Sequence, residues 1–511
     1  MAALPTCSMS MPPSIFQSVK ASDSATSASV AAHICGKPYT SSETFTWLTE
    51  HFRTSLSQCK PDLDLMFLSG VNHVFFHGSC YSPQGAEWPG WRFYASVDMT
   101  PNNNWWSAMP AFSRYIQRCQ SFLQWGDPDN DVLVYLPYYD MIYDQPGTVA
   151  LFDIHSMEKR APKFIETVQT IIKNGYDVDY ISDRYLMQDD VTRRYATIIV
   201  PDVRFMPLAT LKRLLQIAEQ GGQVMFVKSF PTSVPGYGKT KEQKEFAALL
   251  KQLQHKVTFH SEQAMLTVWG EGGIVTSPTY SDGLQFSKAK IEPMRIQQGL
   301  SCIRRTNPDG YHYFVSNLQG KDIDTFVELG VKASEVIFYN PMNGVIDKAR
   351  LDGQGRAKLQ LKSGESIILR TYRMPTATDV KPHKYYNALE YRATPLTNWT
   401  LSFKAALPVS IDKTYTMPEA PQPWTALGDS LLNTTMATGT YTTTFTVPTI
   451  PSNAAYLLDL GDVRETARVL VNGKDAGTLF AVPFRLDVTP YLHAGSNTLV
   501  VEVASQPYCT T

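Results

Sequence analysis

The sequence predicts a multidomain protein in which α/β units come first and β-structure follows, and three observations support this. With 511 residues the chain is too long for one core, because domains average roughly 150 residues. Apolar strand-like runs alternate with amphipathic helix-like runs up to about residue 255. From about residue 256 short alternating strands are separated by Asp-Gly, Asn-Gly and Gly-containing turns.

The first predicted domain, residues 1–130, has the helix and strand succession of the last units of a (β/α)8 barrel. Gly36 and Pro38 end its first helix, and Gly70 closes its second. The expected helices cover residues 21–35, 62–68 and 110–125, and the expected strands cover residues 39–45 and 71–76.

Residues 131–235 predict a small doubly wound, flavodoxin-like α/β domain. Its expected strands are 132–136, 178–181, 197–200 and 223–227, and its expected helices are 161–173 and 208–219. A nucleotide site is disfavoured, because no GxGxxG follows the first strand. Gly238-Lys239-Thr240 resembles the end of a P-loop, but Ser233 stands where its first glycine is needed. We therefore expect this domain to be structural.

Two β-domains are expected after it. Residues 236–385 predict a β-rich domain with the character of a sandwich, and a Pro- and Thr-rich linker near residues 374–384 follows it. Residues 386–511 have the evenly spaced strands of a jelly roll, with a hairpin at Asn472-Gly473. Trp399 and Trp424 are expected in the core of this last domain rather than in a sugar site.

Composition narrows the possible partners. The formal charge of −1 provides no electrostatic reason to expect nucleic acid. No apolar run reaches the ~18 residues that a membrane span needs, and the first residues lack the pattern of a signal peptide. The seven cysteines contain no CxxC pair, which argues against a thiolate zinc site or a disulfide framework.

Glu43 is the residue with the clearest chemical implication. It lies in a short extended segment, and the loop after the next such segment is crowded with aromatic side chains. Aromatic rings stack on the apolar face of a sugar, and a carboxylate can do acid–base or nucleophilic work on it. The aromatic residues are Tyr81, Trp88, Trp91, Phe93, Tyr94, Trp105 and Trp106. A solvated strand-end glutamate is the alternative interpretation of Glu43.

Three runs carry a resemblance to a known family: GKPYTSSETFT, GVNHVFFHGSCYSP…EWPGWRFY and NNNWW…YIQRCQSFLQWGDPDNDV. They resemble glycoside hydrolase family 106, the α-L-rhamnosidases. The order of the domains is also similar, with a galactose-binding-like jelly roll at the end. The resemblance implies a (β/α)8 domain that hydrolyses terminal α-L-rhamnosides with inversion, aided by a calcium ion, in a secreted or periplasmic protein.

By this resemblance Glu43 is the expected general base, and an acid from an earlier strand is its expected partner. Glu87 is a distant candidate for that second carboxylate. Because a barrel takes roughly 250 residues, we expect this chain to be the C-terminal portion of a longer enzyme. The expected substrate-binding residues are His77, Tyr81, Trp91, Asn104, Trp105 and Trp106, and no metal ligands are assigned.

Several alternatives stay open at the level of the sequence. A retaining β-glycosidase of the (β/α)8 class would use Glu43 as its nucleophile, and a non-catalytic carbohydrate-binding protein would use only the aromatic rings. His77 could be a hydrogen-bonded core histidine instead of a sugar ligand. Trp91, Trp105 and Trp106 could pack within loops instead of binding a sugar.

Overall fold

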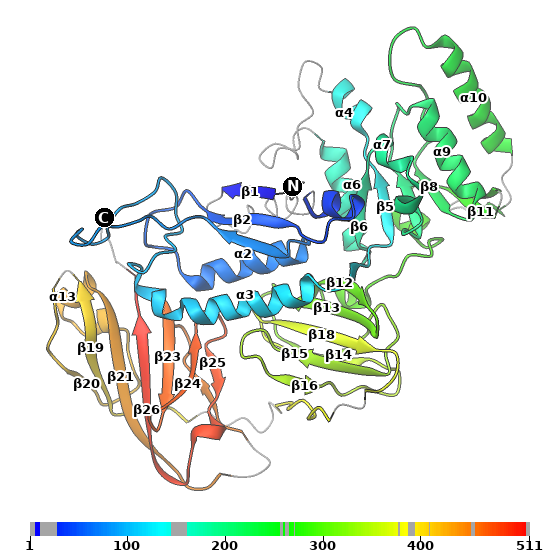
Figure 1. Cartoon of the computed structure of the whole chain (residues 1–511). Helices are drawn as coiled ribbons and strands as arrows, with labels where there is room; N and C mark the ends of the chain where they lie inside the picture. The colour runs from blue at the N-terminus through cyan, green and yellow to red at the C-terminus, as the bar shows by residue number, and fades with distance from the viewer. Residues whose placement is uncertain are drawn as a thin grey trace.

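A computed structural model of the chain shows an α/β arrangement followed by β-sheets (Figure 1). It describes residues 28–144, 161–255, 271–376, 379–386, 394–407, 409–450 and 455–506, and the backbone of residues 6–10, 259–260 and 265–269. Within these ranges no helix is both long and apolar enough to cross a membrane.

A three-stranded parallel sheet of order β1-β2-β3 forms the first layer. Figure 1 shows α2 and α3 along one side of this sheet. Apolar side chains of β2, β3, α2 and α3 share one core there. The elements are β1 (Thr6–Ser10), β2 (Ser41–Thr46), α2 (Leu56–Leu68), β3 (His73–Phe76), η1 (Asn104–Ala108) and α3 (Met109–Leu123).

Two expected helices of this layer differ in extent from the sequence prediction. The first is helical over residues 28–34, and residues 21–27 lie outside the described part of the chain. The second, α2, begins at Leu56 rather than near residue 62. Ser55 and Gln58 form a reciprocal capping box there, and Pro61 lies within the helix. Pro61 is the sixth residue of α2 and has no N–H to donate to the Ser57 carbonyl, so the capping box begins the helix despite the loss of one backbone hydrogen bond.

A seven-stranded sheet follows, in the order β6-β5-β7-β8-β11-β10-β9. The first five of these strands are parallel and have the 2-1-3-4-5 order of flavodoxin-like sheets. Separate cores cover its two faces, as a doubly wound sheet requires. Its elements are β5 (Val132–Tyr135), α4 (Tyr138–Asp144), α6 (Pro162–Lys173), β6 (Val178–Ile181), α7 (Asp183–Leu186), α8 (Asp189–Thr192), β7 (Thr197–Val200), α9 (Leu208–Glu219), β8 (Gln223–Val227), α10 (Thr240–His255), β9 (Phe259–His260), β10 (Met265–Trp269), β11 (Gly272–Ser277) and α11 (Tyr280–Leu284).

This sheet continues past residue 235, where the sequence predicts a change to a β-rich domain. β11 pairs with β8 in parallel, and β10 and β9 extend the same sheet. A glycine allows the close approach: a side chain on Gly272 would meet the carbonyl oxygen of Gly222 at 2.1 Å. Short alternating strands alone do not reveal which sheet they join.

The next layer is an antiparallel sheet of order β16-β15-β18-β13-β12-β4 with a separate β14-β17 pair. These strands enclose their own apolar core. The elements are β4 (Asp127–Pro128), α12 (Pro293–Gln297), β12 (Ser301–Asn307), β13 (Gly310–Ser316), β14 (Ile323–Val327), β15 (Glu335–Tyr339), β16 (Ile346–Lys348), β17 (Ala357–Leu361) and β18 (Ser366–Tyr372).

The C-terminal layer is a sheet of order β20-β19-β21-β26-β23-β24 with a β22-β25 pair. The Asn472-Gly473 hairpin is confirmed, because both residues have positive φ and join paired strands. Trp399 and Trp424 are buried in the core of this layer, as expected. The elements are β19 (Trp399–Leu407), β20 (Tyr415–Met417), η3 (Trp424–Ala426), α13 (Ser430–Asn433), β21 (Met436–Val447), β22 (Leu457–Asp459), β23 (Thr466–Val471), β24 (Lys474–Leu479), β25 (Arg485–Asp487), η4 (Thr489–Tyr491) and β26 (Gly495–Ala504).

Helix α3 joins the first layer to both β-layers (Figure 1). Phe480 of the C-terminal layer packs edge-on against Phe112 and Tyr115 of α3. Ile303 and Phe314 of the antiparallel sheet belong to the same core. The helices that pack against β2 and β3 therefore also contact the antiparallel sheet and the C-terminal layer.

Candidate active site

Glu43 lies on the face of β2 that points away from the helices. Its neighbour Thr44 is fully buried, and the Thr44 hydroxyl lies 3.8 Å from Met66 Sδ of α2. Successive side chains of a strand point to opposite faces, so the Glu43 carboxylate points the other way. Its side chain is 46% exposed.

The alternation of β2 breaks at Phe45, whose φ is +68°. The Phe45 ring packs on the helix side, with its centroid 6.1 Å from that of Phe112. Thr46 then turns toward Glu43, and its hydroxyl donates to Glu43 Oε1 at 2.8 Å. This contact joins two side chains three residues apart, which would face opposite ways in a regular strand.

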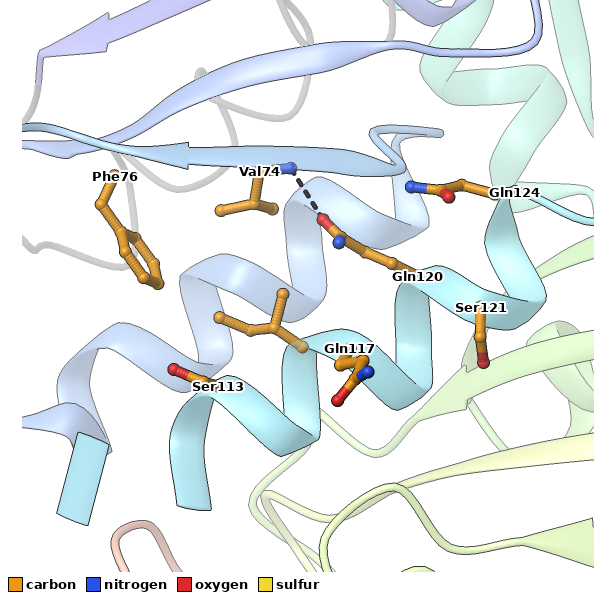
Figure 2. A pocket seen from close by; sticks show the side chains of 8 residues that line it. Val74, Phe76, Ser113, Gln117, Gln120, Ser121 and Gln124 are labelled. Atoms are coloured by element: carbon orange, nitrogen blue, oxygen red, sulfur yellow. Dashed lines mark hydrogen bonds between the residues drawn. The ribbon is translucent and has the colours of Figure 1, made fainter. Parts of the chain in front are cut away.

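His77 approaches Glu43 from the neighbouring strand. Val74 and Phe76 of β3 point toward α3 (Figure 2), so the alternation carries His77, directly after the strand, to the side of Glu43. His77 Nδ1 lies 3.2 Å from Glu43 Oε1, and the His77 side chain is only 6% exposed. His77 Nε2 is buried and has no hydrogen-bond partner among the described residues. The structure therefore brings Glu43 and His77, which the sequence analysis assigned to separate roles, into direct contact.

The environment lowers the pKa of Glu43 below its ordinary value. The hydrogen bond from Thr46 is the largest cause, and the hydrogen bond from His77 is the next. Partial burial acts in the opposite direction and is outweighed. Bonds to the charged form favour ionisation, so Glu43 is a carboxylate at neutral and mildly acidic pH. Such a group suits a base or a nucleophile and not a general acid.

The aromatic loop contributes rings of two kinds. Tyr81 and Trp91 are 77% and 62% exposed, and none of their described contacts reaches Glu43 or His77. Phe93 and Tyr94 contact His77, with ring centroids 5.0 and 6.1 Å away. The sequence analysis named Phe93 and Tyr94 only as members of the loop and did not assign them to the site. Their positions two and three residues after Trp91, in the same aromatic loop, are the signal in the sequence that could have assigned them.

Asn104, Trp105 and Trp106 are not brought to Glu43, and this corrects the sequence prediction. Trp105 is fully buried, and its indole Nε1 donates to the Thr54 carbonyl at 2.9 Å. Trp106 packs partly buried against the same core. Asn104 Nδ2 donates to the carbonyls of Ala437 and Ser505 in the C-terminal layer. These residues hold layers together.

Trp105→Phe tests this placement. We expect the variant to lose about 1–3 kcal/mol of stability, because it removes buried volume and one hydrogen bond. Sugar binding should be unchanged. Trp91→Phe is the matched control, since Trp91 is exposed, and we expect unchanged stability there. Thermal unfolding and sugar titration by tryptophan fluorescence measure both effects; weaker sugar binding by a stable Trp105→Phe variant would contradict the assignment.

A second carboxylate does not join Glu43 among the described residues. Glu87 is exposed in the aromatic loop, and none of its described contacts reaches Glu43. The described ranges also hold no group of three or more His, Cys, Asp or Glu side chains that could bind a metal ion.

A cavity of about 310 Å³ lies on the other side of β3, against α3 (Figure 2). Val74, Phe76 and Ile116 line it together with glutamine and serine side chains of α3. Gln120 Oε1, which also lines the cavity, accepts a hydrogen bond from the backbone N–H of Val74 at 2.7 Å. None of the lining residues is ionisable, so this cavity does not provide acid–base chemistry.

The chain is similar to a curated protein and, in its fold, to a solved structure. A protein of Formosa agariphila named "Putative beta-glucuronidase" is 37% identical over 371 residues, which cover 68% of this chain and 28% of that protein. The solved structure of a rhamnosidase from Novosphingobium sp. PP1Y matches with a TM-score of 0.73 at 21% identity. That match covers 98% of this chain and 47% of the rhamnosidase chain. This chain thus spans less than half the length of either protein.

The family comparison covers the layers that carry the site. A family model described as alpha-L-rhamnosidase, glycoside hydrolase family 106, matches residues 1–352. The matched region includes Glu43, His77 and the aromatic loop. The chain belongs to glycoside hydrolase family 106.

Proposed function

We propose that this protein hydrolyses terminal α-L-rhamnosides with inversion and that Glu43 is the general base. The observation that carries the proposal is the geometry of the Glu43 carboxylate, which Thr46 and His77 hold while the exposed rings of Phe93 and Tyr94 contact His77. Membership in a family of glycosidases supports a carbohydrate substrate.

In the proposed reaction Glu43 takes a proton from water, and the water oxygen bonds to the anomeric carbon of rhamnose. The bond between that carbon and the glycosidic oxygen breaks on the opposite face, and the leaving oxygen takes a proton from an acid. Inverting enzymes place the acid roughly 6.5–9.5 Å from the base. We assign the Nδ1–H tautomer to His77, in which Nδ1–H donates to Glu43 Oε1. In this tautomer Nε2 would accept a hydrogen bond from a sugar hydroxyl, and Tyr81 and Trp91 would stack on the sugar.

The architecture supports a more specific assignment of domains. We propose that β1, β2 and β3 with α2 and α3 are the last units of a (β/α)8 catalytic barrel within residues 1–130. Residues 131–235 would form the flavodoxin-like domain together with α10, β9, β10 and β11, the antiparallel sheet would form the β-rich domain up to about residue 385, and residues 386–511 would form a galactose-binding-like jelly roll. Calcium binding and a secreted or periplasmic location remain predictions from the family.

The test is turnover of 2,4-dinitrophenyl α-L-rhamnoside by this chain. This leaving group departs without protonation, so the assay isolates the base from the acid. We expect release of rhamnose whose first-formed anomer is β, as seen by proton NMR before mutarotation. α-Rhamnose as the first product would contradict inversion, and binding of rhamnose without any release would assign the chain a non-catalytic binding role.

A retaining β-glycosidase is the second candidate. The low pKa of Glu43 suits a nucleophile as well as a base, and the Formosa relative is named for β-glucuronides. This reaction would form a glycosyl ester on Glu43. Mass spectrometry after incubation with a 2-fluoro-β-D-glucuronosyl fluoride would detect the adduct on the peptide that contains Glu43, and its absence would exclude this candidate.

A further inference from the structure

The end of β2 has an unusual backbone for its sequence. Phe45 adopts φ +68°, a left-handed conformation that is rare for a bulky residue. Its ring is fully buried and contacts Trp47, Phe76 and Phe112. Strained backbone persists where surrounding packing determines it, so the core holds this turn in place.

The turn has one chemical consequence at the site. It brings the Thr46 hydroxyl to Glu43 Oε1 at 2.8 Å, although Thr46 itself is only 2% exposed. His77 Nδ1 approaches the same oxygen at 3.2 Å. Of the described residues, only these two hydrogen-bond to the Glu43 carboxylate, and both use Oε1. No described residue hydrogen-bonds to Oε2, and the Glu43 side chain is 46% exposed.

We propose that Thr46 is a positioning residue of the active site, which holds Glu43 Oε1 so that Oε2 faces the attacking water. This inference rests on the proposed function of Glu43 as the base. Thr46 belongs to the buried turn at the end of β2, and His77 directly follows the adjacent strand β3. Two separate elements therefore hold the Glu43 carboxylate. A base held at a fixed angle loses less freedom in the transition state than one that swings.

Thr46→Val removes the hydroxyl and keeps the shape of the side chain. We expect kcat on 2,4-dinitrophenyl α-L-rhamnoside to fall about tenfold, as for loss of one hydrogen bond to a charged group, with KM little changed. The acid limb of the pH profile should move to higher pH, because the carboxylate loses a donor. Thr46→Ser keeps the hydroxyl and should restore both quantities.

Thr44→Val is the matched control. It is the same substitution two residues earlier on β2, but the Thr44 hydroxyl contacts Ser42 O and Met66 Sδ on the helix side. Its pH profile should equal that of the unaltered protein. A purely structural role of Thr46 would lower the melting temperature in Thr46→Val without moving the acid limb.

A second readout is independent of turnover. In protein labelled with carbon-13 at the glutamate carboxyl, the Glu43 signal is the one that Glu43→Gln removes, and its titration midpoint should rise in Thr46→Val only. An unchanged midpoint and acid limb would overturn the positioning role while leaving the base intact. Full activity of Glu43→Gln would instead overturn the proposed function.

Discussion

Replacing Glu43 by glutamine is expected to lower kcat on 2,4-dinitrophenyl α-L-rhamnoside by about 10²- to 10⁴-fold, the usual contribution of a general base. Glutamine keeps the size of the side chain, and its carbonyl oxygen can still accept from Thr46 and His77. It cannot take a proton from water. KM should therefore change little, because the loss falls on the transition state.

The control for this experiment lies in the same region of the chain. Glu87→Gln makes the same change in the exposed aromatic loop, and we expect it to retain activity on this substrate. If Glu87→Gln also abolished turnover on a rhamnoside with a poor leaving group, Glu87 would gain the role of the acid. Unchanged kcat in Glu43→Gln would remove Glu43 from the mechanism.

The sequence allows Glu43 and His77 to be placed at the same edge of one sheet, although it does not predict their direct contact. Both residues lie at or near the carboxyl ends of consecutive short strands, and such strands become parallel neighbours when a helix connects them. Their carboxyl ends then lie at one edge. The same reasoning predicted the doubly wound sheet, because its strands alternate with helices that have one apolar face.

Thr46 could not be found in this way. Its contact with Glu43 depends on a left-handed Phe45, and no glycine or asparagine marks that turn. Trp105 was misplaced for a different reason: an exposed sugar platform and a buried core tryptophan look alike in sequence. Asn104 donates hydrogen bonds to the carbonyls of Ala437 and Ser505, which lie more than three hundred residues later in the chain. Local sequence patterns carry no information about such contacts.

A buried ion pair beneath the site leads to the largest expected effect on stability. Lys60 and Asp64 of α2 are 2% and 0% exposed, and Lys60 Nζ lies 2.8 Å from Asp64 Oδ2. Ser316 Oγ of β13 donates to the same oxygen at 3.0 Å, and Ser366 of β18 and Tyr115 of α3 also donate to this carboxylate. The network joins α2 and α3 to the antiparallel sheet.

Lys60→Met is expected to lower the unfolding free energy by about 3–5 kcal/mol, because it leaves the Asp64 carboxylate buried without its cation. Adding Asp64→Asn should recover part of this loss, since the uncompensated charge disappears. Lys362→Met is the control at an exposed ion pair with Asp322, where we expect a change within about 0.5 kcal/mol. Urea unfolding followed by tryptophan fluorescence measures all three. Equal effects of Lys60→Met and Lys362→Met would show that the buried pair does not hold the layers together. A large loss of stability confined to Lys60→Met would show that the packing of α2 against the antiparallel sheet depends on this buried ion pair.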